Sequence, residues 1–244
     1  MSSQEMFSAR VLSLYPSMFP GPLNYSLAGR ALKDKRWDLS VLNIREFASD
    51  PHKTVDGRPF GGGPGMVLRA DVLDRALSAI IPKEQQNEPV IVLSPRGNPL
   101  DQKRVNELAL GAGLTLICGR FEGIDHRIID AYGAEEISLG DFVLSGGEIA
   151  AIALLDAVVR LLPNVIGAAE SLTNESFTDN LLEYPQFTRP QIWDGYTVPN
   201  ILLSGDHAGI ASWRQNESEQ LTRERRPDLW ARHNRELTSA RVKK

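Results

Sequence analysis

The sequence has 244 residues, enough for one large domain or two small ones, and 42% of them are hydrophobic and 24% charged. This composition excludes a disordered or collagen-like chain. The longest apolar run, 149–162, is interrupted by Asp156 and Arg160, so we expect no helix that spans a membrane. The single cysteine, Cys118, excludes an internal disulfide and a cysteine-rich zinc site. Because the first residues also lack the pattern of a secretory signal, we expect a soluble, cytoplasmic protein without a membrane partner.

The net charge of −4 is unevenly distributed along the chain. Residues 221–244 include eight basic and three acidic residues, a net charge of +5. Such a stretch can be a solvated terminal helix, and it can also be an arm that binds nucleic acid. The charge alone favours the first interpretation and leaves the second open.

The first two thirds of the chain alternate short apolar runs with helical patterns. This alternation is typical of an α/β fold with a mostly parallel sheet. Asp101 is placed to cap a helix, and Ile124, Ile128 and Tyr132 recur at the spacing of one helical face. We expect strands at 9–14, 39–44, 90–93, 114–118 and 136–139.

A longer apolar pattern over 147–162 predicts a buried helix that ends before Pro163. Asp156 and Arg160 stand at i and i+4 on this helix. They form either a simple ion pair or a site in which the arginine points at an anionic group. The helical pattern does not decide between the two.

A polar stretch without helical periodicity follows, so we expect a flexible linker at 167–182. It would join a first domain at 1–166 to a small helical domain at 183–244. The expected core of the small domain consists of Trp193, Trp213 and Trp230 with Leu202, Leu203, Ile210 and Leu221.

Three of the expected strands end in glycine-rich segments, at 94–98, 119–123 and 140–147. Open parallel sheets bind ligands outside the carboxyl ends of their strands. Glycine also allows the backbone to approach a ligand closely. Three such segments in succession favour a small-molecule pocket at this edge of the sheet.

The segment 56–66, Asp-Gly-Arg-Pro-Phe-Gly-Gly-Gly-Pro-Gly-Met, contains five glycines in eleven residues. It lacks the Gly-Lys-Ser/Thr of a P-loop and the G-x-G-x-x-G spacing of a dinucleotide site. Kinase, GTPase and nicotinamide-enzyme functions therefore lose their main support. A purely structural turn remains possible from the spacing.

The sequence resembles the TrmD family, the bacterial tRNA (guanine-N1)-methyltransferases, over nearly its whole length from Phe7 onward. The motifs that carry the resemblance stand in the family's order at 56–66, 93–97, 118–125, 138–148, 185–190, 203–208 and 225–227. The resemblance implies an α/β SPOUT domain with a deep trefoil knot, followed by a small helical C-terminal domain. It also implies a homodimer with active sites shared between the chains. The implied reaction uses S-adenosylmethionine to methylate N1 of the guanosine immediately 3′ of the anticodon of a tRNA.

The family's cofactor-binding positions carry over onto the three glycine-rich segments. The residues that the resemblance places at the cofactor are Ser94, Pro95, Gly119, Glu122, Leu139, Gly140, Asp141, Phe142, Val143, Leu144, Gly146 and Gly147. Backbone groups of such loops can bind adenine without a charged side chain, which explains why no cofactor-sized cluster of acids and bases appears in the sequence.

The resemblance assigns catalysis to Arg160 and to the position of Glu175. Guanine N1 carries a proton at neutral pH, so a carboxylate base is needed, and negative charge then develops on O6, where an arginine stabilises it. The family has Asp-Ser-Phe where this chain has Glu175-Ser176-Phe177. Glutamate keeps the carboxylate and adds one methylene. Asp56 and Ser176 are the expected substrate-binding residues, although Asp56 could equally cap a turn.

The family is associated with magnesium, but the sequence offers no dedicated protein ligand set for Mg²⁺. Two alternatives remain beside guanine-N1 methylation. One is a knotted RNA methyltransferase that acts on a ribose 2′-hydroxyl, and the other is a tRNA-binding protein that kept the pocket without catalysis. The first would not need Glu175 as a base, and the second would bind the cofactor without transferring its methyl group.

Overall fold

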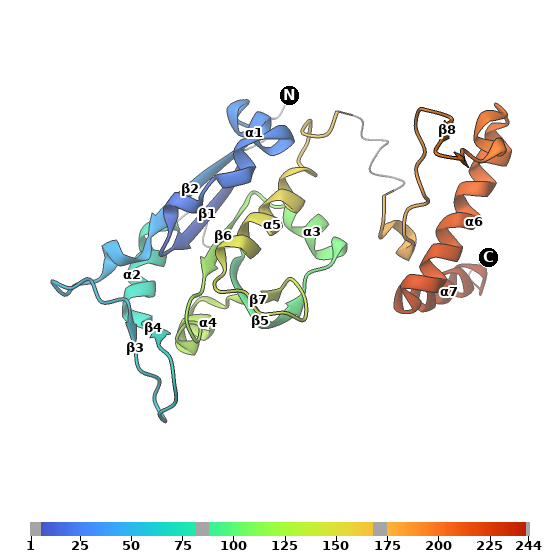
Figure 1. The fold of residues 1–244 in the computed structure, drawn as a ribbon. Helices are drawn as coiled ribbons and strands as arrows, with labels where there is room; N and C mark the ends of the chain where they lie inside the picture. Colours follow the sequence, from blue (N-terminus) through green and yellow to red (C-terminus); the bar gives the residue numbers. More distant parts are fainter. Residues whose placement is uncertain (1–5, 82–87, 168–174, 243–244) are drawn as a thin grey trace. The chain divides into compact units, whose positions relative to one another are not determined.

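A parallel sheet of five strands forms the centre of the N-terminal part of the chain, in the order β2-β1-β6-β5-β7 (Figure 1). The strands are β1 (Phe7–Ser13), β2 (Trp37–Asn43), β5 (Val90–Pro99), β6 (Gly113–Cys118) and β7 (Glu135–Ser138). Every neighbouring pair is parallel. The predicted α/β fold with a mostly parallel sheet is therefore confirmed, and the trefoil knot stays a prediction.

This computed structural model describes residues 6–81, 88–167 and 175–242. Its contacts divide the chain into two units, Met1–Gly167 and Ala168–Lys244. The division falls beside residue 167, where the linker is expected to begin. Residues 168–174 of that linker lie outside the described residues, and its remainder, 175–182, belongs to the second unit. The three expected domain boundaries stay a prediction.

Strand β5 extends beyond the expected strand at 90–93, because the chain pairs with β7 again from the end of the segment 94–98. Pairing runs from Ile91 to Leu93, shifts register, and resumes at Asn98 opposite Ile137. The expectation of a loop over 94–98 was therefore wrong. The intervening residues form an irregularity within the strand, and such irregularities re-aim side chains next to ligand sites.

Helices cover both faces of the sheet, because neighbouring strand residues point to opposite sides. In β6, Leu116 joins one hydrophobic cluster and Ile117 joins the other. The first cluster receives side chains from α1 (Ser26–Lys33), α3 (Gln102–Ala109) and α5 (Glu148–Val159). The second receives side chains from α2 (Ala70–Ile80) and α4 (His126–Tyr132).

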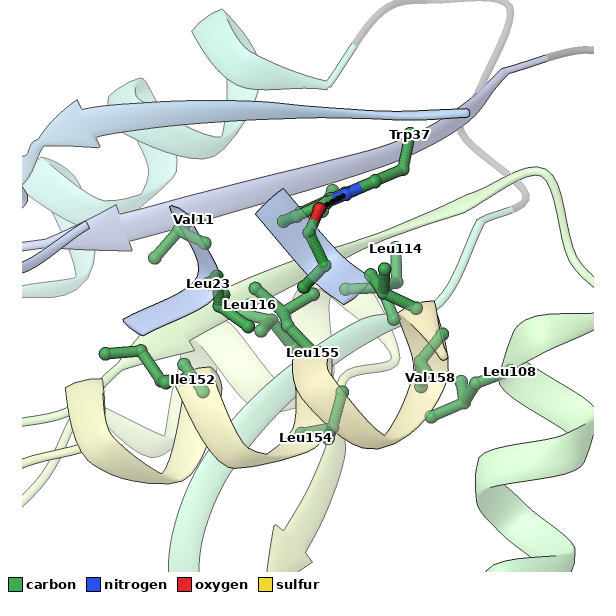
Figure 2. Packing of buried hydrophobic residues seen from close by; sticks show 14 of the residues in the cluster. Val11, Leu23, Trp37, Leu108, Leu114, Leu116, Ile152, Leu154, Leu155 and Val158 are labelled. Atoms are coloured by element: carbon green, nitrogen blue, oxygen red, sulfur yellow. Dashed lines mark hydrogen bonds between the residues drawn. The ribbon is translucent and has the colours of Figure 1, made fainter. Parts of the chain in front are cut away.

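Helix α5 is the buried helix that the apolar pattern predicts, but it ends at Val159 and not at Leu162. Figure 2 shows its Leu154, Leu155 and Val158 among residues of the sheet and of α3. All three are fully buried. Burial of such a side chain contributes about 1.5–3 kcal/mol, so this packing fixes α5 on the sheet.

Helix α3 begins at the cap expected from the sequence, and α4 begins at a cap that the sequence analysis does not name. The Asp101 carboxylate accepts a hydrogen bond from the Arg104 amide at 2.8 Å. Asp125 does the same for Arg127 at 3.1 Å, so α4 starts just after Ile124. Gly133 ends α4 in the left-handed conformation with φ of 57°.

The glycine-rich segment 56–66 lies in a hairpin between β3 (Asp56–Gly57) and β4 (Val67–Leu68). Four of its glycines have positive φ. The base of the hairpin is fixed to the loop after β6, where the Glu122 amide donates to the Met66 carbonyl at 2.9 Å. This hairpin thus borders the glycine-rich loop after β6.

The second unit is helical, as expected, with α6 (His207–Arg225), α7 (Pro227–Val242) and a short hairpin of β8 (Ile192–Trp193) and β9 (Tyr196–Thr197). Its expected tryptophan core was wrong. Trp193 is 67% exposed and stacks on Tyr196 across the hairpin. Among the described residues of this unit, the buried positions are Leu181, Leu229, Ser218, Thr222 and His233. The core here is partly polar because α6 and α7 hold the 175–182 segment through hydrogen bonds.

Candidate cofactor and substrate site

A cavity of about 260 Å³ lies at the carboxyl ends of β5, β6 and β7, where the strand-end argument places it. Eleven of the twelve expected cofactor residues line it, and Asp141 does not. The lining members are Ser94, Pro95, Gly119, Glu122, Leu139, Gly140, Phe142, Val143, Leu144, Gly146 and Gly147. The structure thus brings three distant segments together, and their binding of the cofactor remains a prediction.

The wall of the cavity between β7 and α5 is shaped by Ser138 and Gly140. The Ser138 hydroxyl accepts from the Gly140 amide at 3.2 Å and donates to the Gly140 carbonyl at 3.1 Å. Gly140 has φ of 152°, a conformation that residues with a Cβ rarely adopt. The chain turns tightly at this point, because the Phe142 amide donates to the Gly140 carbonyl at 2.9 Å.

Gly147 allows α5 to start directly against the end of β6. Its amide donates to the Gly119 carbonyl at 2.9 Å. A Cβ on Gly147 would lie 2.8 Å from Cα of Cys118, closer than side chains approach a backbone. This glycine therefore has a steric role, whereas a Cβ on Gly119 would meet only Ile124, at 3.7 Å, and leaves room for a ligand.

An ion pair between Arg120 and Glu148 lies beside the cavity, and the sequence analysis did not identify it. Arg120 Nη2 is 2.9 Å from Glu148 Oε2, and the Glu148 side chain is 1% exposed. Ser13 Oγ donates to Glu148 Oε1 at 2.7 Å, and Arg120 Nη1 donates to the Ser145 carbonyl at 3.1 Å. The guanidinium also lies 4.5 Å from the centre of the Tyr15 ring. One carboxylate thus joins the ends of β1 and β6 to the start of α5.

The buried Cys118 thiol next to this pair is not a nucleophile at neutral pH. Burial raises its pKa well above the ordinary value, and the negative charge of Glu148 raises it further. The thiol therefore stays protonated, and the thiolate is the reactive form of cysteine. The thiol is also fully buried, so the structure gives no support to covalent catalysis through Cys118.

The polar groups of the cavity suit a cationic ligand with a neutral ring system. Its two arginines are each paired with a carboxylate, Arg120 with Glu148 and Arg96 with Glu136 at 3.0 Å. Glu122 has no ion-pair partner among the described residues. The wall therefore offers a carboxylate and many backbone groups, and it lacks the unpaired cations that a phosphate ligand needs. The expected cofactor, S-adenosylmethionine, has a sulfonium, an ammonium, one carboxylate and a neutral adenine; its net positive charge agrees with this wall, and its binding here stays a prediction.

The expected catalytic and substrate residues lie outside this cavity. Arg160 is the C-terminal cap of α5 and is partly exposed, and Asp56 lies on β3 with its backbone opposite Leu68. Glu175 and Ser176 are partly exposed residues of the second unit. There the Ser176 hydroxyl accepts from the Glu183 amide at 3.0 Å. The roles of these four residues stay predictions.

A second cavity, of about 310 Å³, lies beside Glu175 in the second unit. Its wall includes Glu175, Asp179, Tyr184 and Arg214, and the Arg214 guanidinium lies 4.8 Å from the centre of the Tyr184 ring. The carboxylate expected to act as a base therefore borders a polar recess, not a closed core.

The described part of the basic C-terminal stretch, residues 221–242, forms the end of α6 and the whole of α7. The Arg223 guanidinium lies 4.7 Å from the centre of the Trp230 ring. Arg226 binds Asp228 at 2.7 Å and lowers the pKa of that carboxyl to about 2. Within residues 6–81, 88–167 and 175–242, no helix is long and apolar enough to cross a membrane. In the same ranges, no group of three His, Cys, Asp or Glu side chains is placed to hold a metal ion.

Comparison with known proteins identifies the family. Residues 7–232 match the family described as tRNA (Guanine-1)-methyltransferase TrmD. A tRNA (guanine-N(1)-)-methyltransferase from Nitrobacter winogradskyi is 61% identical over 223 residues, 91% of this chain and 92% of that protein. Proteins of the same name from Bradyrhizobium diazoefficiens and Mesorhizobium japonicum are 58% and 57% identical, over 95% and 93% of this chain and 91% and 97% of their own lengths. The family match over nearly the whole chain and this level of identity lead to one conclusion: the chain belongs to the TrmD family of tRNA (guanine-1)-methyltransferases.

Proposed function

We propose that the chain transfers a methyl group from S-adenosylmethionine to N1 of the guanosine immediately 3′ of the anticodon of a tRNA. The observation that carries the proposal is the glycine-lined cavity at the strand ends, with one unpaired carboxylate, in a member of a methyltransferase family. When bound there, S-adenosylmethionine supplies an electrophilic methyl group on its sulfonium.

In this proposal the cavity holds the methyl donor through the three glycine-rich segments. Backbone groups at 138–147 bind the adenine, and the Glu122 carboxylate attracts the cationic part of the donor. Asp141, which does not line the cavity, is assigned no direct contact. Arg120 and Arg96 are each paired with a carboxylate, so their positive charges are compensated and repel the sulfonium less.

Glu175 accepts the proton of guanine N1, and Arg160 donates hydrogen bonds to O6 as negative charge develops there. A positioned general base contributes typically ~10²–10⁴-fold to the rate. Loss of one donor to a developing oxyanion costs typically ~10²–10³-fold. Ser176 and Asp56 contact the guanine or its neighbours. The extra methylene of Glu175, compared with aspartate, is accommodated in the recess that its side chain borders.

The proposed active unit is a homodimer in which both chains contribute to each site. Support for the homodimer comes from the family. The basic residues at the end of α6 and on α7 contact the phosphates of the tRNA, so binding weakens as salt concentration rises. The family's association with magnesium implies a requirement for this ion in methyl transfer. Transfer measured with and without a chelator tests that requirement, and light scattering measures the oligomeric state.

The deciding experiment is methyl transfer from labelled S-adenosylmethionine to an unmodified tRNA with guanosines at the third anticodon position and the next one. Mass spectrometry of nuclease digests then locates the methyl group. We expect 1-methylguanosine at the second of these positions. A 2′-O-methyl product would establish the ribose alternative instead, and retained donor binding with no transfer would establish a non-catalytic tRNA-binding protein.

Glu175→Gln and Glu175→Asp form a matched pair for the base. We expect the glutamine variant to lose transfer by ~10²-fold or more while it still binds S-adenosylmethionine, because the amide cannot take the N1 proton. The aspartate variant keeps the carboxylate and is expected to retain activity. Near-normal transfer by Glu175→Gln would refute the role of Glu175.

A further inference from the structure

The segment that carries Glu175 is held in an unusual backbone conformation within the second unit. Phe177, Asp179 and Asn180 have φ of 79°, 51° and 58°. Residues other than glycine rarely adopt this left-handed region, and they keep it only where surrounding contacts enforce it. The contacts that enforce it here come from α6 and α7.

Helix α6 holds one end of the segment through a buried threonine. The Leu182 amide donates to Thr222 Oγ1 at 2.8 Å, and that hydroxyl donates to the Ser218 carbonyl at 2.6 Å. Leu181 is buried beside it. The segment also closes on itself, because the Phe177 amide donates to the Leu181 carbonyl at 2.6 Å.

Helix α7 holds the middle of the segment through His233. Its Nδ1 lies 2.7 Å from the backbone oxygen of Asp179, and the residue is 6% exposed. A carbonyl oxygen can only accept, so Nδ1 must carry a proton in this contact. The ring is stacked on Trp230, with centroids 5.6 Å apart, which fixes the direction of the donor. The other contact from α7, Asn180 to Glu236 at 3.0 Å, is exposed to solvent.

The turn held by His233 is connected to Glu175 through one further hydrogen bond. The Thr178 amide donates to the Glu175 carbonyl at 3.2 Å, so the backbone of Glu175 is tied to the residue just before Asp179. Only two peptide groups separate the Asp179 carbonyl from the backbone of Glu175 along this path. A shift of the Asp179 carbonyl would therefore also shift Glu175, the proposed base.

We propose that His233 is a positioning residue for methyl transfer: its Nδ1–H holds the 178–180 turn through the Asp179 carbonyl and so keeps the Glu175 carboxylate in its working direction. This inference rests on the proposed role of Glu175 as the base. His233 itself touches neither the tRNA nor the methyl donor in this proposal. Its loss should lower the rate of the chemical step and leave the binding of both largely unchanged.

Three substitutions of His233 separate the hydrogen bond from the size and polarity of the ring. Asparagine places an amide nitrogen at the position of Nδ1, one bond beyond Cγ, whereas glutamine places it about where Nε2 lies. Leucine keeps the volume without a donor. Asn234→Ala is the matched control, since Asn234 is the next residue on α7, is exposed, and its side chain donates to the Trp230 carbonyl of its own helix.

The test measures single-turnover methyl transfer by the full-length protein, with KM for tRNA, the dissociation constant for S-adenosylmethionine and Tm for each variant. A misplacement of a catalytic group by about 1 Å can cost ~10²-fold, so we expect His233→Leu and His233→Gln to be ~10- to 100-fold slower. His233→Asn should stay within about threefold of the unchanged protein and Asn234→Ala within twofold, with both binding constants preserved throughout.

Several outcomes would overturn the inference. A folded His233→Gln variant with the unchanged rate would show that the Nδ1 donor is not needed. Equal loss in the asparagine and glutamine variants, in step with a lower Tm, would show a merely structural role. Glu175→Gln in the same assay keeps the two proposals apart: if it remains active, the base assignment fails, and if it is inactive while the folded His233 variants are normal, only the positioning role fails.

Discussion

Replacing Glu148 with glutamine would remove the buried charge that joins β1, β6 and α5 with little change of volume. The new amide keeps an oxygen for the Ser13 hydroxyl. Removal of one partner from a buried ion pair costs about 3–5 kcal/mol, because the other charge stays behind without compensation. The Arg120 side chain is 18% exposed and keeps its bond to the Ser145 carbonyl, so we expect the lower end of that range, ~3 kcal/mol.

Thermal and urea unfolding followed by circular dichroism measure this loss. A loss of this size in a protein of 150–250 residues corresponds to a decrease in Tm of roughly 6–12 °C. Glu122→Gln is the matched control, because Glu122 is an exposed carboxylate of the same cavity without an ion-pair partner among the described residues. We expect it to change stability by less than about 0.5 kcal/mol. A loss below about 1 kcal/mol in Glu148→Gln would refute the reasoning.

The double replacement of Arg120 and Glu148 by methionine completes this test. Exchange of a whole buried ion pair for apolar residues of similar volume is often neutral or stabilising. We therefore expect the double variant to be more stable than Glu148→Gln, by at least about 1 kcal/mol. A double variant that is less stable than Glu148→Gln would show that the ion pair contributes more to stability than the mutual compensation of its two charges.

Four further outcomes follow from the structure. Gly147→Ala should destabilise the protein and weaken S-adenosylmethionine binding, measured by calorimetry, because its Cβ would lie 2.8 Å from Cα of Cys118; normal binding would contradict the close approach. Arg160→Ala should slow single-turnover transfer by ~10²–10³-fold, and a loss confined to KM would argue against contact with O6. Cys118 should resist thiol reagents at pH 8 in the folded protein and react after unfolding, because burial raises its pKa. Finally, the pKa of Asp228 is lowered from 3.8 to about 2, so its contribution to stability is complete above pH 3.8 and is lost as the pH falls toward 2. In Arg226→Ala, NMR titration should return this pKa toward 3.8, and an unchanged value would contradict the cause.

The strands and the cavity could be predicted from the sequence because both depend on local patterns. A parallel strand covered on both faces reads as an apolar run, and every residue of β6 is buried. The position of the cavity follows from the rule for strand ends. The extension of β5 could not be predicted, because its Ser-Pro-Arg-Gly-Asn stretch has the composition of a turn, and its pairing depends on β7 forty residues later.

The polar core of the second unit and the Arg120–Glu148 pair depend on contacts between distant residues. Ser218, Thr222 and His233 are polar residues of α6 and α7, so no apolar periodicity marks them as buried. Tryptophans are ordinarily good core candidates, but here Trp193 lies in a two-residue strand with no layer to cover it in its own unit. The sequence does mark Glu148 as unusual, because it is a single acidic residue that follows two glycines and begins a long apolar helix. Its partner, Arg120 in the loop after β6, could not be predicted from the sequence.

The two hydrophobic clusters lie on opposite faces of one sheet and take alternate residues of the same strands. An insertion or deletion within such a strand therefore disturbs both clusters. Insertion of one residue within β6 would exchange the side chains that face the two clusters, placing Leu116 and Ile117 on the wrong faces at once. Relatives of different length are therefore expected to add or lose residues in exposed turns outside the motifs named above, and not within β6.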